Sequence, residues 1–381
     1  MHNVVEALRK LVSFNTVSEN SNLELVEFLR DQCLEHDFPC TVMPSKDGSK
    51  ANFLATFGPN VPGGILLSGH SDVVTIEGQK WSSPPFQLVE RGEKLFGRGT
   101  CDMKGFLAVI LGNLPALGRA RLTRPIHLAV SFDEEVGCLG APSLIKEIKR
   151  LLPPISTVVV GEPTGMEVAV AHKGVTVGHV HVVGVQAHSS QTHLGISANA
   201  FAARFIVLLD NLSCKLSEEK NQKLRLAPKH STINVGIVQG GMNPYTISDH
   251  CSFSWDLRVI PGESAAPLIQ RISNYAASLE AEMKQFFESA SIRMNVHSVP
   301  GLDANLNSHA TQVCQRWRNT SNSIDVSYGT EAGLFQEAGF STVICGPGSI
   351  EQAHKPDEFI TIQQLQSCHE FFHRITDNLS T

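Results

Sequence analysis

The spacing of apolar and polar residues predicts two kinds of structure in this chain. Over residues 1–170, short apolar runs alternate with helical stretches, as in βαβ units built around a buried sheet. Residues 64–69 form a continuous apolar run, which is typical of a strand buried on both faces. Residues 106–114 predict a helix that Pro115 would end. Strands of the same buried kind are predicted at 126–132, 157–160 and 341–345, and a last helix from about Thr361.

The pattern changes from about residue 173. Residues 251–259 alternate apolar with polar positions, and this period of two predicts a strand with one buried and one open face. Helices are predicted at 197–209 and 265–287, and further strands at 176–185, 231–238 and 292–299. The resulting order, βαββαβ, is that of a small two-layer α+β domain of the ferredoxin-like kind. We therefore expect an α/β domain of residues 1–172 and 300–381, interrupted by an inserted domain at 173–299.

Composition and charge narrow the classes of function. The chain has 381 residues, of which 42% are hydrophobic and 18% charged, as in a globular protein of about two domains. Its formal net charge of −6 disfavours a general nucleic-acid binder, which needs a positive field. No run approaches the roughly 20 apolar residues that span a bilayer, and the N-terminal segment lacks the apolar stretch of a secretory signal. We expect a cytoplasmic protein with neither nucleic acid nor membrane as a partner.

The nine cysteines are scattered and contain no Cys-x-x-Cys pair. This pattern predicts neither a disulfide framework nor a thiolate zinc site. Cys101 and Cys138 stand near the acidic residues described next, but free cysteine is commonly a small buried side chain. We therefore interpret both as packing residues.

Acidic and imidazole side chains follow the predicted buried strands. They are His70 and Asp72 after 64–69, Glu134 and Glu135 after 126–132, Glu162 after 157–160, and His354 after 341–345. Ligands of open α/β sheets bind beyond the carboxyl ends of the strands. We therefore expect these side chains to share one crevice, with Asp102 beside them at the start of a helix.

This set of side chains suits two divalent metal ions. Histidine and carboxylate are ordinary zinc ligands, and a carboxylate such as Asp102 can bridge two ions about 3.5–4 Å apart. Asp72 would lie on the same side of its strand as His70, where it could accept the second N–H of the imidazole. Cobalt or manganese would fit such ligands as well. Taken singly, a His-x-Asp pair is usually structural and a Glu-Glu pair is usually a solvated loop.

Five segments carry a resemblance to a known family. They are Ser68-Gly69-His70-Ser71-Asp72-Val73-Val74, Gly97-Arg98-Gly99-Thr100-Cys101-Asp102-Met103-Lys104-Gly105, Asp133-Glu134-Glu135, Gly161-Glu162-Pro163-Thr164 and Gln352-Ala353-His354-Lys355-Pro356-Asp357-Glu358. In this order they resemble the co-catalytic zinc amidohydrolases and peptidases, which include acetylornithine deacetylase, succinyl-diaminopimelate desuccinylase and glutamate carboxypeptidase. The resemblance covers nearly the whole chain. It implies a zinc-peptidase-like α/β catalytic domain with an inserted lid and dimerisation domain.

The resemblance also implies roles for single residues. Asp102 would bridge two zinc ions, and the peptide bond after it would be cis. One zinc ion would be completed by His70 and Glu162, and the other by Glu135 and His354. Glu134 would remain as the general base for a water molecule that the two ions activate, and Asp72 would be a further catalytic residue.

In the inserted domain, residues 186–190 resemble a family loop whose histidine reaches the active site of the partner subunit. His188 would there stabilise the developing oxyanion, and this implies a homodimer. The plainer alternative is a histidine in a surface loop. Arg258 matches a family arginine that binds the substrate carboxylate, to which a guanidinium fork is suited. The alternative for Arg258 is an exposed surface residue, and Asn234 is a further candidate for the same wall.

Two more segments, Gly329-Thr330-Glu331-Ala332 and Cys345-Gly346-Pro347-Gly348, resemble the acetylornithine deacetylases. We hypothesise that Glu331 binds the side-chain ammonium of N2-acetyl-L-ornithine, and that Gly346 and Gly348 contact the substrate. The implied reaction is deacetylation to ornithine and acetate in arginine biosynthesis. Tyr245 departs from the family, because relatives commonly carry an asparagine there. The alternatives are a dipeptidase or carboxypeptidase, another N-acyl-amino-acid deacylase, and a non-catalytic metal-binding regulatory protein on the same scaffold.

Overall fold

The computed structural model describes residues 1–219 and 225–381, and the chain divides into two compact units. Unit 1 consists of Met1–Ala171, Asp303–Val326 and Thr330–Thr381, and unit 2 of His172–Leu302 and Ser327–Gly329. The predicted boundaries, after residues 172 and 299, lie one and three residues from those of the structure. Within the described part of the chain, no helix is long and apolar enough to cross a membrane.

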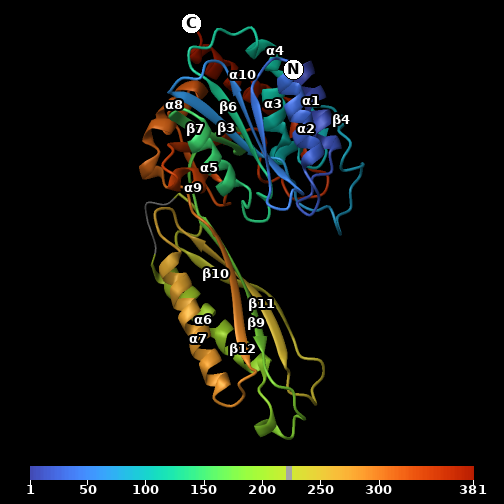
Figure 1. The fold of residues 1–381 in the computed structure, drawn as a ribbon, viewed down its shortest axis with the longest axis vertical. Coiled ribbons are helices and arrows are strands. Elements are labelled where there is room, and N and C mark those ends of the chain that lie inside the picture. Colours follow the sequence, from blue (N-terminus) through green and yellow to red (C-terminus); the bar gives the residue numbers. More distant parts are fainter. Residues whose placement is uncertain (220–224) are drawn as a thin grey trace. The chain divides into compact units, whose positions relative to one another are not determined.

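An eight-stranded sheet forms the centre of unit 1 (Figure 1). Its strand order is β1-β2-β6-β3-β7-β14-β8-β13. The strands are β1 (Cys40–Pro44), β2 (Ala51–Phe57), β3 (Gly64–His70), β6 (Ile126–Ser131), β7 (Ile155–Pro163), β8 (Ala169–His172), β13 (Ile324–Val326) and β14 (Thr342–Gly346). The four strands predicted from apolar runs, β6, β3, β7 and β14, are consecutive neighbours in this sheet and run parallel. Every residue of β3 is buried, as its apolar run predicts.

The helices of unit 1 pack around this sheet (Figure 1). They are α1 (His2–Ser13), α2 (Leu23–Leu34), α3 (Gly105–Gly112), α4 (Leu114–Leu117), α5 (Ala141–Leu151), α8 (Ser308–Arg318), α9 (Ala332–Glu337) and α10 (Ile362–Leu379), with short turns η1 (Thr100–Lys104) and η3 (Ala304–Leu306). A separate three-stranded sheet has the order β15-β5-β4. Its strands are β4 (Val89–Arg91), β5 (Lys94–Phe96) and β15 (Phe359–Thr361).

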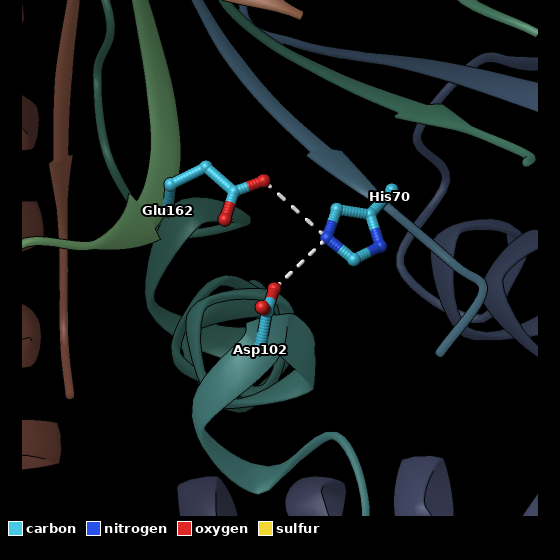
Figure 2. Close-up of side chains that lie close together, drawn as sticks. All are labelled: His70, Asp102 and Glu162. Carbon is cyan, nitrogen blue, oxygen red and sulfur yellow. Dashed lines mark hydrogen bonds and ion pairs between the residues drawn. The ribbon is translucent and has the colours of Figure 1, made fainter. Parts of the chain in front are cut away.

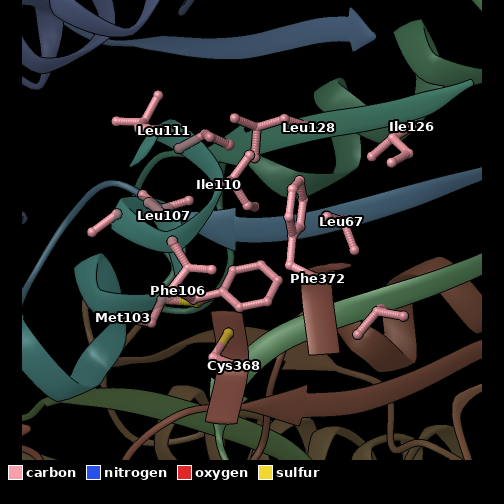
Figure 3. Close-up of a cluster of buried hydrophobic side chains, with 14 of the residues drawn as sticks. Leu67, Met103, Phe106, Leu107, Ile110, Leu111, Ile126, Leu128, Cys368 and Phe372 are labelled. Carbon is pink, nitrogen blue, oxygen red and sulfur yellow. The ribbon is translucent and has the colours of Figure 1, made fainter. Parts of the chain in front are cut away.

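Helix α3 lies inside the core of unit 1, which explains why it is apolar on all sides. All residues from Gly105 to Leu111 are buried. Figure 3 shows its side chains among those of β3, β6 and α10, including Leu67, Leu128 and Phe372. The prediction that Pro115 ends this helix is wrong. Helix α3 ends at Gly112, and Pro115 lies in the first turn of α4, where its missing N–H leaves no hydrogen bond unmade.

Unit 2 contains a four-stranded antiparallel sheet of order β10-β11-β9-β12 and two long helices (Figure 1). Its elements are β9 (Gly174–Val183), η2 (Thr192–Leu194), α6 (Ala198–Glu218), β10 (Thr232–Gly240), β11 (His250–Val259), α7 (Ala266–Lys284) and β12 (Ser291–Val299). Along β11 buried and part-exposed residues alternate, as predicted. The buried face forms a second core with residues of both helices, such as Phe205 and Leu279. The predicted βαββαβ order is confirmed.

Candidate metal centre

The functional side chains stand where four parallel strands end. His70 is the last residue of β3, Glu162 lies near the end of β7, Glu134 and Glu135 follow β6, and His354 lies in the turn after β14. These strands are neighbours in the sheet, so their carboxyl ends meet at one edge. Asp102 comes from η1, the turn that leads into α3. The expected single crevice therefore has its physical origin in the strand order of unit 1.

The first of two candidate metal-binding groups consists of His70, Asp102 and Glu162 (Figure 2). His70 Nε2 lies 3.1 Å from Asp102 Oδ1 and 3.3 Å from Glu162 Oε1. All three side chains are buried. Figure 2 shows both carboxylates directed at the same ring nitrogen.

The second group consists of Asp102, Glu135 and His354. His354 Nε2 lies 3.2 Å from Asp102 Oδ2 and 3.0 Å from Glu135 Oε2. Asp102 therefore offers one oxygen to each group, which is the arrangement expected of a bridging carboxylate. The peptide bond between Asp102 and Met103 is cis, as expected.

The hydrogen bonds of His70 indicate that a cation belongs between these groups. His70 Nδ1 lies 2.9 Å from the main-chain oxygen of Asp72, and because that oxygen can only accept, Nδ1 carries a proton. In a neutral ring, Nε2 would then point its lone pair at two carboxylate oxygens, which is repulsive. Either a second proton or a metal ion must stand there. Imidazole and carboxylate are good ligands for divalent ions such as zinc, so the donor set fits a metal.

The remaining contacts support the same conclusion. Glu135 Oε1 is buried and accepts no hydrogen bond from any described residue, and such orphaned acceptors need an explanation. Hydrogen bonds with Asp102 and Glu135 raise the pKa of His354 to about 10. Burial raises the pKa of Glu135 to about 7 and that of Glu162 to about 8. Protons thus take the place that a bound cation would otherwise fill.

We expect the metal-free protein to lose stability as the pH rises from about 5 to 9. Glu135 and Glu162 titrate at about 7 and 8 in the folded chain, above the ordinary value of 4.5, so folding takes up protons. A group whose pKa is raised by folding contributes stability that is complete below its pKa in the unfolded chain. This contribution is lost as the pH rises through its pKa in the folded chain. His354, whose pKa is raised to about 10, also makes the folded chain less stable as the pH rises towards that value. Urea unfolding of chelator-treated protein across this range measures the effect.

Two controls accompany this measurement. Saturating zinc should flatten the pH dependence, because the metal supplies the positive charge without a proton. The variant Glu135→Gln should make the dependence of the metal-free protein shallower, because one titrating carboxyl group is removed. A metal-free protein whose stability increased between pH 6 and 9 would contradict the assigned ionisation.

The carboxylate of Asp72 does not make the predicted hydrogen bond with His70. The predicted contact with the imidazole of His70 is made by the main-chain oxygen of Asp72, whereas its carboxylate Oδ1 lies 3.6 Å from the ring nitrogen. The carboxylate instead accepts the main-chain N–H groups of Glu134 at 3.0 Å and Glu135 at 3.2 Å. It also accepts a hydrogen bond from Ser18 at 2.7 Å. Asp72 therefore fixes the backbone that carries both glutamates, and nothing in the sequence pattern points to Ser18.

Glu134 belongs to neither group of candidate ligands. Its Oε1 lies 3.3 Å from the thiol sulfur of Cys138, which donates the hydrogen bond. Burial, together with the charge of Glu162, raises the pKa of Glu134 well above its ordinary value. Cys138 was expected only to pack. It is buried as expected, and it also contacts the proposed base, a role that the sequence did not indicate.

Three residues of unit 1 that were predicted to contact substrate have structural contacts of their own. Glu331 is fully buried, and its two oxygens accept hydrogen bonds from Ser68 at 2.6 Å and Ser131 at 2.7 Å. A Cβ at Gly346 would lie 2.0 Å from the main-chain oxygen of Gly161. Gly348 has φ +88°, and a Cβ there would lie 2.5 Å from the sulfur of Cys101. Close packing thus accounts for both glycines, and their contact with substrate stays a prediction.

The predicted residues of unit 2 lie on its loops and on the open face of its sheet. His188 is exposed in a loop that is held by hydrogen bonds to residues 245–247. Arg258 is half-exposed, and its Nε donates to the carboxylate of Asp256. Asn234 on β10 pairs directly with Asp256 on β11, so Asn234 and Arg258 share one face. Tyr245 is 72% exposed.

Comparisons with known proteins show the family to which the chain belongs. The profile of peptidase family M20/M25/M40 matches residues 66–378. The chain is 31% identical to an acetylornithine deacetylase of Photorhabdus laumondii, with 98% of this chain and 96% of the relative covered. It is 29% identical to an acetylornithine deacetylase of Pasteurella multocida, with 100% and 97% covered.

Solved structures show the same fold. An M20 family metallo-carboxypeptidase from Sulfolobus solfataricus matches with a TM-score of 0.78 at 15% identity, with 99% of both chains covered. A tripeptidase from Staphylococcus aureus matches with a TM-score of 0.75 at 18% identity, with 99% of this chain and 98% of that chain covered. The protein therefore belongs to peptidase family M20/M25/M40, whose members are metal-dependent, and it is a hydrolase that acts on amide bonds.

Proposed function

We propose that this protein removes the acyl group of N-acyl amino acids at a centre of two zinc ions, with N2-acetyl-L-ornithine as the substrate. The observation that carries the proposal is the pair of candidate metal groups that share Asp102, with Glu134 beside them but in neither. The names of the relatives, acetylornithine deacetylases at about 30% identity over nearly the whole chain, support this substrate. Such a reaction would belong to arginine biosynthesis in the cytoplasm.

The residues divide the work as follows. His70, Asp102 and Glu162 would hold one divalent ion, and Asp102, Glu135 and His354 the other. Ions held there would acidify a water molecule and polarise the amide carbonyl. Glu134 accepts the proton that the attacking water loses and passes it to the nitrogen of the leaving amine when the C–N bond breaks. Asp72 holds the Glu134 backbone, and the Cys138 thiol restrains its carboxylate.

We also propose a homodimer in which His188 serves the active site of the partner subunit. His188 Nδ1 accepts a hydrogen bond from the main-chain N–H of Ser190 at 3.2 Å, so the proton of the neutral ring is on Nε2. That N–H can donate to a developing oxyanion. Edge strand β10 also exposes Ile237 and Val238, and neighbouring α6 exposes Val207. An open edge strand with exposed apolar side chains favours pairing with a second chain.

The open face of the unit 2 sheet supports a contact with the carboxylate of the substrate. Arg258 contacts Asp256 through Nε, and its guanidinium has further N–H donors that suit a carboxylate. Asn234 lies on the same face and supplies an amide donor. We propose that both recognise the α-carboxylate that all N-acyl amino acids share.

A panel of substrates tests the proposed function. Purified protein supplied with zinc or cobalt should hydrolyse N2-acetylornithine with a higher kcat/KM than N-succinyl amino acids or dipeptides. Ornithine and acetate should form in equal amounts. Turnover of dipeptides alone would make the enzyme a dipeptidase instead. Binding of two metal ions without turnover of any substrate would favour a regulatory protein.

The variant Glu331→Gln separates two roles of this glutamate. If Glu331 binds the substrate ammonium, the variant should lose the preference for N2-acetylornithine over neutral N-acetyl amino acids by about tenfold, since a charged hydrogen bond contributes about 1.5–3 kcal/mol. Its burial between Ser68 and Ser131 requires that this network opens when substrate binds. The same panel measures the preference. An unchanged preference with lower activity on every substrate would mean that Glu331 only supports the sheet.

A further inference from the structure

Glu358 is a buried carboxylate that lies behind the candidate metal centre, four residues after His354. Its Oε1 accepts the main-chain N–H groups of Cys101 at 2.8 Å and Asp102 at 3.1 Å. Its Oε2 accepts the main-chain N–H of Gly99 at 3.0 Å. One side chain thus binds three amides of the short segment that delivers the shared carboxylate. The resemblance includes Glu358 in a motif but implies no role for it.

Arg98 connects this carboxylate with the turn that carries His354. Its Nη1 donates to Glu358 Oε2 at 2.6 Å, and the side chains of both residues are only 1% exposed. Its Nη2 donates to Gln79 Oε1 at 2.7 Å. Gln79 Nε2 in turn donates to the main-chain oxygen of His354 at 3.1 Å. The chain of contacts therefore begins at the amide of Asp102 and ends at the carbonyl of His354.

We propose that Glu358, Arg98 and Gln79 form an outer polar chain that positions the second metal group, formed by Asp102, Glu135 and His354. The inference rests on the proposed two-metal centre. The chain fixes the backbone of two of the three ligands in that group. The first group shares Asp102, but its other two ligands, His70 and Glu162, belong to strands β3 and β7 and have no contact with this chain. Loss of the outer chain should therefore weaken the second group more than the first.

The variant Glu358→Gln tests this inference. The amide has nearly the same shape, but its NH₂ end must face either the N–H groups of Cys101 and Asp102 or those of Gly99 and Arg98. Two hydrogen bonds are lost in both orientations. We expect one Co²⁺ ion to bind at least about tenfold more weakly, as for partners that orient metal ligands in other proteins. The other ion should be weakened less, because Asp102 is the only one of its ligands that the chain holds. Titration of chelator-treated protein, followed by calorimetry and by Co²⁺ absorption, measures both affinities.

Reference variants assign the two binding events. His354→Ala removes a ligand of the second group alone, so the binding event that it weakens belongs to the second group. Glu358→Gln should weaken this same binding event. Glu351→Gln changes the same functional group on the exposed part of this loop and should leave both affinities unchanged. If Glu358→Gln does not fold, Gln79→Ala tests the inference instead. Gln79 is only half-buried, so this variant should fold. It should weaken the same event to a smaller degree.

The outcomes are distinguishable from those that test the proposed function. A wild-type protein that binds fewer than two ions would overturn the two-metal centre and this inference together. If the wild-type protein binds two ions, only the inference would be overturned by variants that bind both ions as tightly as the wild type does. Variants whose affinities for the two ions fall to the same degree would overturn it as well. In that case the buried Arg98–Glu358 pair would stabilise the fold without orienting the ligands.

Discussion

Glu134→Ala should lower kcat on N2-acetylornithine by at least about 100-fold and leave the metal content of the protein unchanged. Glu134 lies outside both candidate metal groups, so its removal leaves every ligand in place. The backbone of this loop is held by Asp72 through main-chain N–H groups, which the substitution does not alter. Steady-state kinetics and elemental analysis of the same preparation measure the two quantities.

Two further variants separate the base from the ligands. Glu134→Gln keeps the shape of the side chain but cannot take up a proton, and it should be as inactive as Glu134→Ala. Glu135→Ala removes the oxygen that lies 3.0 Å from His354 Nε2, and it should lower the metal content. Substantial activity in Glu134→Ala, or loss of metal from it, would show that the two neighbouring glutamates have been assigned the wrong roles.

If His188 is the proposed donor to the oxyanion, His188→Ala should lower kcat by about 100-fold or more. Its metal content should not change, since His188 belongs to neither metal group. The informative experiment mixes this variant with Glu134→Ala after subunit exchange. In a mixed dimer, one active site combines Glu134 of one chain with His188 of the other. Random exchange should therefore restore about one quarter of the wild-type activity, because half of the dimers are mixed and each has one intact site.

The mixing experiment has a clear negative outcome. If His188 acted within its own chain, no mixed dimer would contain an intact site, and the mixture would stay inactive. His179→Ala is a matched control, because His179 is also exposed in unit 2 and bonds a serine hydroxyl through Nδ1. It should retain wild-type activity both alone and in mixtures.

Four buried strands of unit 1, β3, β6, β7 and β14, could be predicted because their apolar runs are signals that do not depend on partners, whereas the buried strands β2 and β8 were not predicted. Their order in the sheet could not be predicted, because strands far apart in sequence, such as β7 and β14, pair through long-range contacts. The short strands β4, β5 and β15 were missed, since three residues are too few for a periodic pattern. Alternation of buried and open positions was sufficient for β11 because one of its faces is covered by a core.

The candidate ligands could be predicted because His70, Glu135, Glu162 and His354 follow predicted strands and Asp102 stands at the start of a predicted helix. The residues that hold these ligands in position could not be predicted. The carboxylate of Asp72 binds main-chain groups of Glu134 and Glu135, and sequence does not reveal the direction of a main-chain N–H. The burial of Glu331 depends on Ser68 and Ser131, which are more than 190 residues away in the chain. Such contacts arise only once the sheet has assembled.

The position of β14 has a consequence for synthesis of the chain on the ribosome. His70, Asp102 and Glu162 all precede residue 172, so the first metal group is encoded before the inserted unit. The second group cannot form until His354, which follows β14, has been synthesised. Until β14 is synthesised, β7 lacks its neighbour on one side and remains an open edge. A nascent or prematurely terminated chain could therefore hold one metal ion at most, and hydrolytic activity would begin only when translation is nearly complete.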